Sequence, residues 1–370
     1  MSPPVTETPG RPNDFDPDAA IAVNDRPTPP DDLHALDPAE LTYRPWHGEA
    51  ELSEVARLFD MAGWGPVELD WLRPWLLQGP LGPSLVMVIA DDDRGELLGM
   101  NMLNPYRVQL GDRVSIGARG RAAILAPRLR RRARGVDSVD EGDPFHRLNL
   151  ARREQMDARG WWFSYALPNP KMVRRGELRT FDDGLHRSRV ELGAGLRVDI
   201  DGEGPRRSSL EVVPTEGHFG PEYDMLWQRA RTSLGIECAV ARDAQGLQHV
   251  RGEYVHGDQI RLECRLPNSG ELLGFTEFHP HGDPKLADIL AVDADALDAV
   301  MGSSVAWLRS HPDDHEMAFF TGVPHPAHRE ALRNVGGREV DWTFYFEISS
   351  HHELVGSEFE ASRWYVTAGD

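Results

Sequence analysis

The sequence has few cysteines and no long hydrophobic run. Cys238 and Cys264 are its two cysteines, and neither lies in a C-x-x-C or Cys/His pair. They are expected to be buried reduced thiols, with a disulfide between them left open. No stretch approaches about 18 consecutive apolar residues, as a transmembrane helix requires. The first residues also lack the basic and apolar regions of a secretory signal, so the sequence predicts a cytoplasmic protein without membrane contact.

Several catalytic signatures are missing as well. The sequence contains no G-x-S-x-G and no G-x-x-x-x-G-K-[ST] motif, which disfavours a hydrolase and a P-loop enzyme. No histidine pair has a carboxylate at a recognised metal-ligand spacing, so we expect surface histidines and no metal site. The pairs are His279 with His281, His325 with His328, and His351 with His352.

Positive charge is scarce. The chain has 40 lysines and arginines against 60 acidic residues, for a net charge of −20. Phosphate backbones require a basic surface, so nucleic acid is not expected as a partner. An acidic surface suits a cationic substrate such as an amine through long-range attraction, and it also suits solubility alone.

Residues 1–40 differ in composition from the rest of the chain. They hold nine of the 28 prolines, and nine acidic residues against two arginines. Such a segment cannot bury enough apolar surface to offset its chain entropy, so we expect a disordered tail.

Apolar periodicity from residue 41 predicts two α/β halves, residues 41–200 and 201–370. The expected order in the first is β-α-α-β-β-β-loop-α-β, with strands Thr42–Trp46, Leu85–Ala90, Glu96–Leu103, Val114–Ala126 and Trp161–Leu167, and helices Glu49–Ala62, Val67–Leu77 and Phe145–Arg159. The second half has similar parts: helices Tyr223–Leu234, Ala294–Arg309 and Ala327–Asn334, and strands Gln259–Cys264, Glu271–Phe278, Leu286–Val292, Met317–Thr321 and Asp341–Ile348. No close repeat is visible between the halves.

An arginine-rich segment separates the fourth strand from the next helix. It reads Pro127-Arg128-Leu129-Arg130-Arg131-Arg132-Ala133-Arg134-Gly135. Backbone N–H groups of such a loop can form a donor array for a pyrophosphate, and arginine adds charge-assisted bonds. Arg130, Ala133 and Gly135 occupy the key positions of the Q/R-x-x-G-x-G/A loop of the GNAT superfamily of acyl-CoA-dependent N-acyltransferases, which this segment resembles.

Other segments resemble two-domain GNAT proteins in the same order along the chain. Phe145-His146-Arg147-Leu148 opens the helix after the loop, and Tyr165-Ala166-Leu167-Pro168-Asn169 ends the next strand. Arg242-Asp243-Ala244 opens the second half, and Leu332-Arg333-Asn334-Val335-Gly336-Gly337 precedes its closing strand. The resemblance covers about residues 42–348. It implies two GNAT-like mixed central sheets flanked by helices.

The resemblance also implies an activity and a site. The cofactor, used as a substrate, would be acetyl-CoA or another acyl-CoA, and its partner a small amine, amino acid or amino sugar of specialised metabolism. The pantetheine arm would insert between Ile124-Leu125-Ala126 and the strand of Ser164–Leu167. Further contacts would come from Arg130, Arg131, Arg132, Ala133, Arg134, Gly135 and Asn169. Tyr165 could protonate the thiolate, and Glu253, Glu277 or His279 could face the cleft, with Tyr165 and Glu253 the first candidates.

The match has departures that keep alternatives open. Ala133 replaces a glycine, an acidic insert runs from Val136 to Pro144, and Val114–Ala126 lacks a glutamate where a base is often found. In the second half Asp293-Ala294-Asp295-Ala296 follows the equivalent strand and would repel a pyrophosphate. We therefore expect CoA in the first half only. The alternatives are a GNAT-fold ligand-binding or interaction module without acyl transfer, or altered chemistry such as aminoacyl-tRNA-dependent transfer or acyl-CoA decarboxylation.

Overall fold

A computed structural model describes residues 38–79, 81–127, 129, 143–168, 186–199, 210–215, 218–248, 260–279, 285–310, 317–320, 325–353, 356 and 359–367. The expected disordered tail lies outside these residues, except for Pro38–Glu40, a 3-10 helix (η2). The chain divides into two compact units. The second unit contains residues 106–117, 165–174 and all residues from 186 onward, so the division does not fall at one point of the chain. The predicted boundary between residues 200 and 201 lies outside the described residues and stays a prediction.

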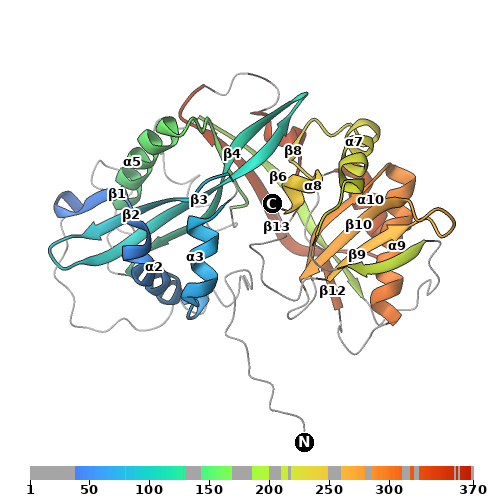
Figure 1. Cartoon of the computed structure of the whole chain (residues 1–370), viewed down its shortest axis with the longest axis horizontal. Coiled ribbons are helices and arrows are strands. Elements are labelled where there is room, and N and C mark those ends of the chain that lie inside the picture. Colours follow the sequence, from blue (N-terminus) through green and yellow to red (C-terminus); the bar gives the residue numbers. More distant parts are fainter. Residues whose placement is uncertain are drawn as a thin grey trace, which may run out of the picture. The chain divides into compact units, whose positions relative to one another are not determined.

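The first unit is built on a sheet with the strand order β1-β2-β3-β4, followed by β5. Helices α2 and α3 pack on one face of this sheet and α5 on the other (Figure 1). The strands are β1 Thr42–Pro45, β2 Leu85–Asp91, β3 Glu96–Leu110, β4 Arg113–Leu125 and β5 Ser164–Ala166. The helices are η3 Gly48–Glu51, α2 Leu52–Phe59, the π-helix η4 Asp60–Trp64, α3 Leu69–Leu77 and α5 Pro144–Ala158. Every element predicted in this half is present.

Local signals explain α2 and α5, the helices on the two faces of this sheet. In α2, the four apolar residues at helical spacing are all buried: Leu52, Val55, Leu58 and Phe59. Helix α5 starts with Pro144 at its first position, where the missing N–H costs nothing. It ends before Gly160, whose φ of 67° suits the left-handed conformation that follows many helices.

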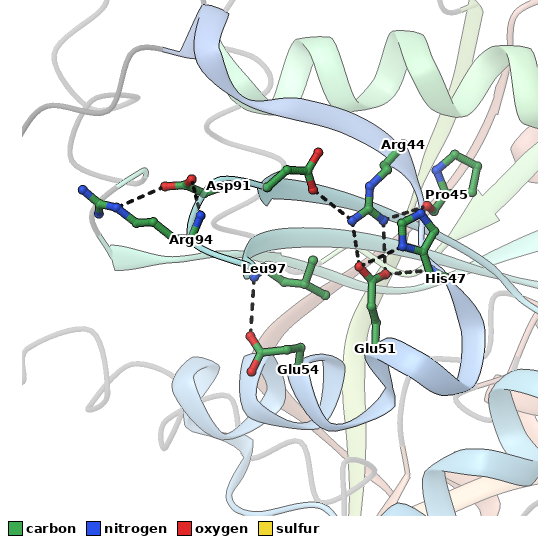
Figure 2. Close-up of polar contacts among 9 residues, drawn as sticks. Arg44, Pro45, His47, Glu51, Glu54, Asp91, Arg94 and Leu97 are labelled. Carbon is green, nitrogen blue, oxygen red and sulfur yellow. Dashed lines mark hydrogen bonds and ion pairs between the residues drawn. The ribbon is translucent and has the colours of Figure 1, made fainter.

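Figure 2 shows how β1 is held against the start of α2. Arg44 donates to both carboxylate oxygens of Glu51, at 2.7 and 3.2 Å, and to Asp92 at 3.2 Å. The backbone N–H of His47 donates to Glu51 at 2.7 Å. Burial would raise the pKa of Glu51, but these hydrogen bonds and the Arg44 charge lower the pKa overall. The ionised Glu51 thus joins β1 to α2, and Arg44 extends the link to the β2–β3 turn.

Strands β3 and β4 form a hairpin that is longer than the sequence predicts. The predicted strand ends at Leu103, whereas β3 continues through Pro105 to Leu110. Gly111, with a φ of 56°, makes the turn, and the amide of Gln109 donates across it to the carbonyls of Gly111 and Arg113. The outer part of the hairpin belongs to the second unit and pairs there with β8 (Cys238–Val240).

The second unit contains a mixed sheet with the strand order β13-β6-β12-β11-β10-β9-β7. Its strands are β6 His186–Asp199, β7 Glu211–Thr215, β9 Ile260–Arg265, β10 Leu272–His279, β11 Lys285–Ala291, β12 Met317–Phe320 and β13 Arg338–Ser350, with β14 Trp364–Tyr365 pairing with β8. Its helices are α7 Glu222–Leu234, α8 Ala244–Leu247, α9 Ala294–Ser310, α10 Pro326–Asn334 and the 3-10 helix η8 Ala361–Arg363. The sequence missed β6, β7, β8, β14 and α8.

Side-chain contacts assign the two faces of this second sheet. Thr276 of β10 lies 2.7 Å from Ser304 of α9, so α9 covers one face. The ring centroid of Phe275, the preceding residue of β10, lies 5.5 Å from that of Tyr223 of α7, so α7 covers the other face. Both faces are therefore buried, as the near-continuous burial of β9 and β10 requires.

The structure confirms that the two cysteines are free and buried, and it corrects the predicted surface position of two histidines. Cys238 and Cys264 are free and buried. His328 and His351, expected at the surface, are instead 0% and 8% exposed. His328 is drawn into the core because α10 turns its apolar face, with Ala331 and Leu332, toward the second sheet. No described helix is long and apolar enough to cross a bilayer, and the described residues hold no group of three or more possible metal ligands.

Candidate functional site

Three predicted cofactor contacts, Ile124, Leu125 and Ala126, lie together at the end of β4. The N–H of Ala126 donates to the carbonyl of Leu98 in β3 at 2.7 Å. The carbonyl of Ala126 accepts the N–H of Leu129 at 2.9 Å. Both peptide groups of Ala126 are thus bonded within the first unit, and its N–H is not available to a pantetheine.

The direction of the neighbouring peptide groups follows from strand alternation. The N–H of Ala126 and the carbonyl of Ile124 point toward β3, so the carbonyl and N–H of Leu125 point away from it. Gly99 of β3 supports this assignment, because a Cβ there would lie 2.9 Å from the carbonyl oxygen of Ile124. Leu125 is therefore the residue of the three whose backbone is directed toward the other side of β4.

Most of the predicted pyrophosphate loop falls outside the described residues. Arg130, Arg131, Arg132, Ala133, Arg134 and Gly135 are all in this category, as are Asn169 and Glu253. The described residues before the loop, Pro127 and Leu129, are helical, and Leu129 is 1% exposed in the core beneath α5. The start of the loop is therefore fixed to the first unit by packing.

Helix α5 begins on the far side of the acidic insert and is capped by the chain itself. The carboxylate of Asp143 accepts the N–H groups of Phe145 at 2.7 Å and His146 at 3.2 Å. A pyrophosphate would compete with this carboxylate for the same donors. If the first unit binds CoA, the donors must come from the loop before the insert and not from the start of α5.

The second half shows the same arrangement at α9, which follows the equivalent strand β11. The carboxylate of Asp293 accepts the N–H of Ala296 at 2.8 Å, and its carbonyl accepts the N–H of Leu297 at 3.0 Å. No insert or arginine-rich segment separates β11 from α9 in the sequence. The donors at this helix start are therefore already bonded beside a negative charge.

Tyr165, the candidate proton donor, lies in β5 within an aromatic cluster of the second unit. Its ring centroid is 5.9 Å from that of Trp364, 6.2 Å from Phe346 and 6.4 Å from Tyr106. Its side chain is 2% exposed. These contacts hold the ring of Tyr165 in the interior of the second unit.

Glu277, another candidate, lies in a buried charged row across the second sheet. It is 2% exposed and stands opposite Arg261 of β9 and Asp288 of β11. Asp288 is bonded in turn by Arg242. The environment of Glu277 is thus the interior of the second unit. The backbone of His279 ends the same strand, β10.

The structure also explains the Arg242-Asp243 pair that opens the second half. Arg242 is buried and donates from Nε to both oxygens of Asp288, at 3.0 and 3.1 Å. Asp243 points the other way, caps α8 by accepting the N–H of Gly246 at 2.7 Å, and accepts Arg107 at 2.9 Å. Sequence reasoning noticed the pair but missed Asp288, which carries no motif of its own.

Comparison with known proteins extends this description. No protein-family model matches the sequence, and no curated protein matches it. Solved structures do match. A GCN5-related N-acetyltransferase from Anabaena variabilis superposes with a TM-score of 0.55 at 12% identity, over 83% of this chain and 72% of that one. Another from Kribbella flavida gives 0.51 at 12% identity, over 84% and 71%.

A third solved structure matches across nearly its whole length. It is a tandem GNAT protein from the clavulanic acid biosynthesis pathway, solved without acetyl-CoA. Its TM-score is 0.51 at 14% identity, over 84% of this chain and 98% of that protein. The chain therefore has the fold of a tandem GNAT protein, with two GNAT-like mixed sheets flanked by helices, as the sequence motifs predicted.

Proposed function

We propose that this protein is an acyl-CoA-dependent N-acyltransferase that acts on a small amine, amino acid or amino sugar. The observation that carries the proposal is the tandem GNAT fold, matched over 84% of the chain by a protein of the same two-part plan. Acetyl-CoA is the first choice of acyl donor, because GCN5-related N-acetyltransferases are among the structures similar to this chain. The cytoplasm is the proposed compartment.

The first half is the proposed cofactor half. Its strand β4 leads into the loop from Arg130 to Gly135, and the loop's N–H groups and arginines would hold the pyrophosphate. The pantetheine arm is proposed to lie along Ile124, Leu125 and Ala126 at the end of β4, although the N–H of Ala126 already donates to Leu98. The second half has Asp293 at the corresponding helix start.

The proposed reaction is direct attack of the amine nitrogen on the thioester carbonyl. A C–N bond forms, the C–S bond breaks, and the products are an amide and free CoA. Glu253 is the proposed base that takes the ammonium proton, and the hydroxyl of Tyr165 is the proposed donor to the leaving thiolate. The nitrogen loses its second proton when the tetrahedral intermediate collapses to the amide, and that proton restores the Tyr165 hydroxyl through solvent. Glu253 releases the first proton to solvent. The net charge of −20 favours the approach of a cationic acceptor.

One observation favours a second candidate, a GNAT-fold binding module without acyl transfer. Asp143 occupies the N–H groups at the start of α5, and the insert before it contains the further acids Asp137, Asp140 and Glu141. Negative charge next to the loop in the sequence opposes binding of a pyrophosphate. Measured CoA binding separates the two candidates.

Thermal stability with added ligand provides that test. A ligand at 100 times its dissociation constant stabilises the folded state by about 2.7 kcal/mol. We expect such a shift in thermal midpoint with CoA, acetyl-CoA or a longer acyl-CoA, and its loss in the Arg130→Ala/Arg132→Ala variant. The control is Arg153→Ala/Arg333→Ala, which removes the same charge from two exposed sites.

A second measurement tests transfer itself. Release of free thiol from the acyl-CoA that binds is followed with a panel of amines, amino acids and amino sugars. Binding followed by amine-dependent thiol release supports the acyltransferase. Binding without thiol release favours the second candidate, and no shift with any CoA overturns the cofactor assignment.

A further inference from the structure

The short segment Trp364–Thr367 is buried throughout its length. Its four side chains are between 1% and 3% exposed. Trp364 pairs with Cys238 and Tyr365 with Ala239 in a parallel ladder between β14 and β8. Because side chains alternate along a strand, successive residues of this segment reach two different groups of partners.

Trp364 faces the aromatic cluster that contains Tyr165. Its ring centroid lies 5.9 Å from Tyr165 and 5.3 Å from Phe346, and Phe346 lies 6.2 Å from Tyr165. The three rings therefore form a closed triangle. Tilted pairs at these separations are favourable beyond the area they bury, so the position of Trp364 helps to set that of the Tyr165 ring.

Tyr365 and Thr367 face a polar network instead. Arg242 donates to the hydroxyl of Thr367 at 2.9 Å, and its guanidinium carbon lies 4.6 Å from the ring centroid of Tyr365. The hydroxyl of Tyr365 donates to the carbonyl of Ile289 and lies 2.9 Å from Nε2 of His328. Since Tyr365 has one proton to give, Nε2 of His328 is the donor in the second bond.

Arg242 itself has little freedom to move. It bonds both oxygens of Asp288 and also donates to the carbonyl of Val240 at 2.9 Å. Arg242 and Asp288 are each 1% exposed. Burial, together with the nearby His325 and Arg242, lowers the pKa of His328 well below its usual value, so the ring stays neutral in this network.

We propose that Trp364 is a positioning residue for Tyr165, and that the buried Arg242–Asp288 pair holds it in place through Tyr365 and Thr367. This inference rests on the proposed function, in which the Tyr165 hydroxyl protonates the leaving thiolate. It gives the second half a role in the reaction, since β8, β11 and α10 all contribute to the network. A buried ion pair of the second unit thereby helps to set the position of the Tyr165 ring.

The test compares two pairs of variants. Trp364→Phe keeps an aromatic ring but alters the triangle, and Trp227→Phe is its control, because Trp227 is equally buried in the core around Tyr223. Thr367→Val removes the Arg242 bond, and Thr276→Val is its control, because it removes a buried hydroxyl bonded to Ser304. Far-UV circular dichroism first establishes that each variant is folded.

Kinetics provide the first reading. We expect Trp364→Phe to lower kcat about 10-fold and to change KM for the acyl-CoA less than about twofold, as for a misplaced group that acts in the transition state. Thr367→Val should lower kcat by a smaller factor. The two controls should keep the wild-type kcat. Equal losses in Trp364→Phe and Trp227→Phe would overturn the inference.

A spectroscopic reading does not depend on activity. The seven tyrosines are replaced by 3-fluorotyrosine, and the ¹⁹F resonance of Tyr165 is assigned by its loss in Tyr165→Phe. This resonance should shift in Trp364→Phe and Thr367→Val and stay in place in both controls. An unmoved resonance in Trp364→Phe overturns the inference. Absence of thiol release from the wild-type protein counts against the proposed function and not against the packing of Trp364 on Tyr165. Failure of the proposed function and failure of this inference therefore give different results.

Discussion

The guanidinium of Arg242 donates from Nε to both carboxylate oxygens of Asp288, at 3.0 and 3.1 Å, in the interior of the second unit. The two residues are 46 positions apart, in the segment after β8 and in β11. Both are 1% exposed. The pair is therefore held by its geometry and by the further bonds of Arg242, with little access to water.

Removing one charge of this pair should destabilise the second unit strongly. In Asp288→Asn the guanidinium of Arg242 stays buried without its counter-ion, and we expect a loss of about 3–5 kcal/mol in the free energy of unfolding. Urea denaturation measures this loss. The control is Asp199→Asn at the exposed ion pair with Arg338, which should cost less than about 1 kcal/mol. Similar losses in both variants would contradict the prediction.

The contribution of Glu51 should depend on pH in a defined direction. Its pKa is lowered in the folded protein from an ordinary value near 4.5. The bonds from Arg44 and His47 therefore contribute stability that is present above the unfolded pKa and is lost as the pH falls through the folded pKa. We expect the stability difference between wild type and Glu51→Gln to be present at pH 7 and to shrink below about pH 4.5. A difference that grows on acidification would reverse the sign and refute the assignment.

Two glycine-to-alanine changes should have opposite effects. In Gly99→Ala the new Cβ would meet the carbonyl oxygen of Ile124 and the side chain of Leu125 at 2.9 Å, so β4 must shift, at a cost of about 1–3 kcal/mol. We also expect weaker binding of acyl-CoA, because the shift falls at Leu125. Gly302→Ala in α9 meets no atom within 4 Å and should stabilise by about 0.5–1 kcal/mol. Calorimetry with and without CoA checks both.

Removing the hydroxyl of Tyr165 should separate packing from chemistry. Tyr165→Phe keeps the ring contacts with Tyr106, Phe346 and Trp364, so stability should change by about 1 kcal/mol or less. Loss of a proton donor to the thiolate should lower kcat about 100-fold. Tyr106→Phe, a neighbour in the same cluster, is the control and should keep its rate. A Tyr165→Phe variant with the wild-type rate would identify Tyr165 as a packing residue.

Most of the fold could be predicted because hydrophobic periodicity is a local signal. The residues at helical spacing in α2 are all buried, and the strands with continuous apolar runs are present. Strand β6 was missed although the buried Leu192, Leu196 and Val198 recur at even spacing, because the glycines at 193 and 195 interrupt the pattern. Pro105 likewise interrupts the strand pattern, so the outer half of β3 was not predicted.

The site was harder to predict, for a different physical reason. A charged residue has no local signal that tells whether it is buried, since its partner can be far along the chain, as Asp288 is from Arg242. The same holds for His328, which its bond to Tyr365 and the apolar face of α10 place in the core. The predicted pyrophosphate loop has a local pattern because its residues are consecutive, but it lies outside the described residues and stays a prediction that CoA binding tests.

The length of the β3–β4 hairpin has a consequence for the order of synthesis. Val108 and Leu110, near its tip, pair with Val240 and Cys238 and are 0% and 6% exposed. The hairpin leaves the ribosome about 130 residues before β8 does. These side chains therefore remain exposed to water until β8 has been synthesised. Pairing across such a separation is slow compared with local contacts. A chain cut between the halves would keep this apolar tip uncovered, and folding of the tip therefore requires translation through β8.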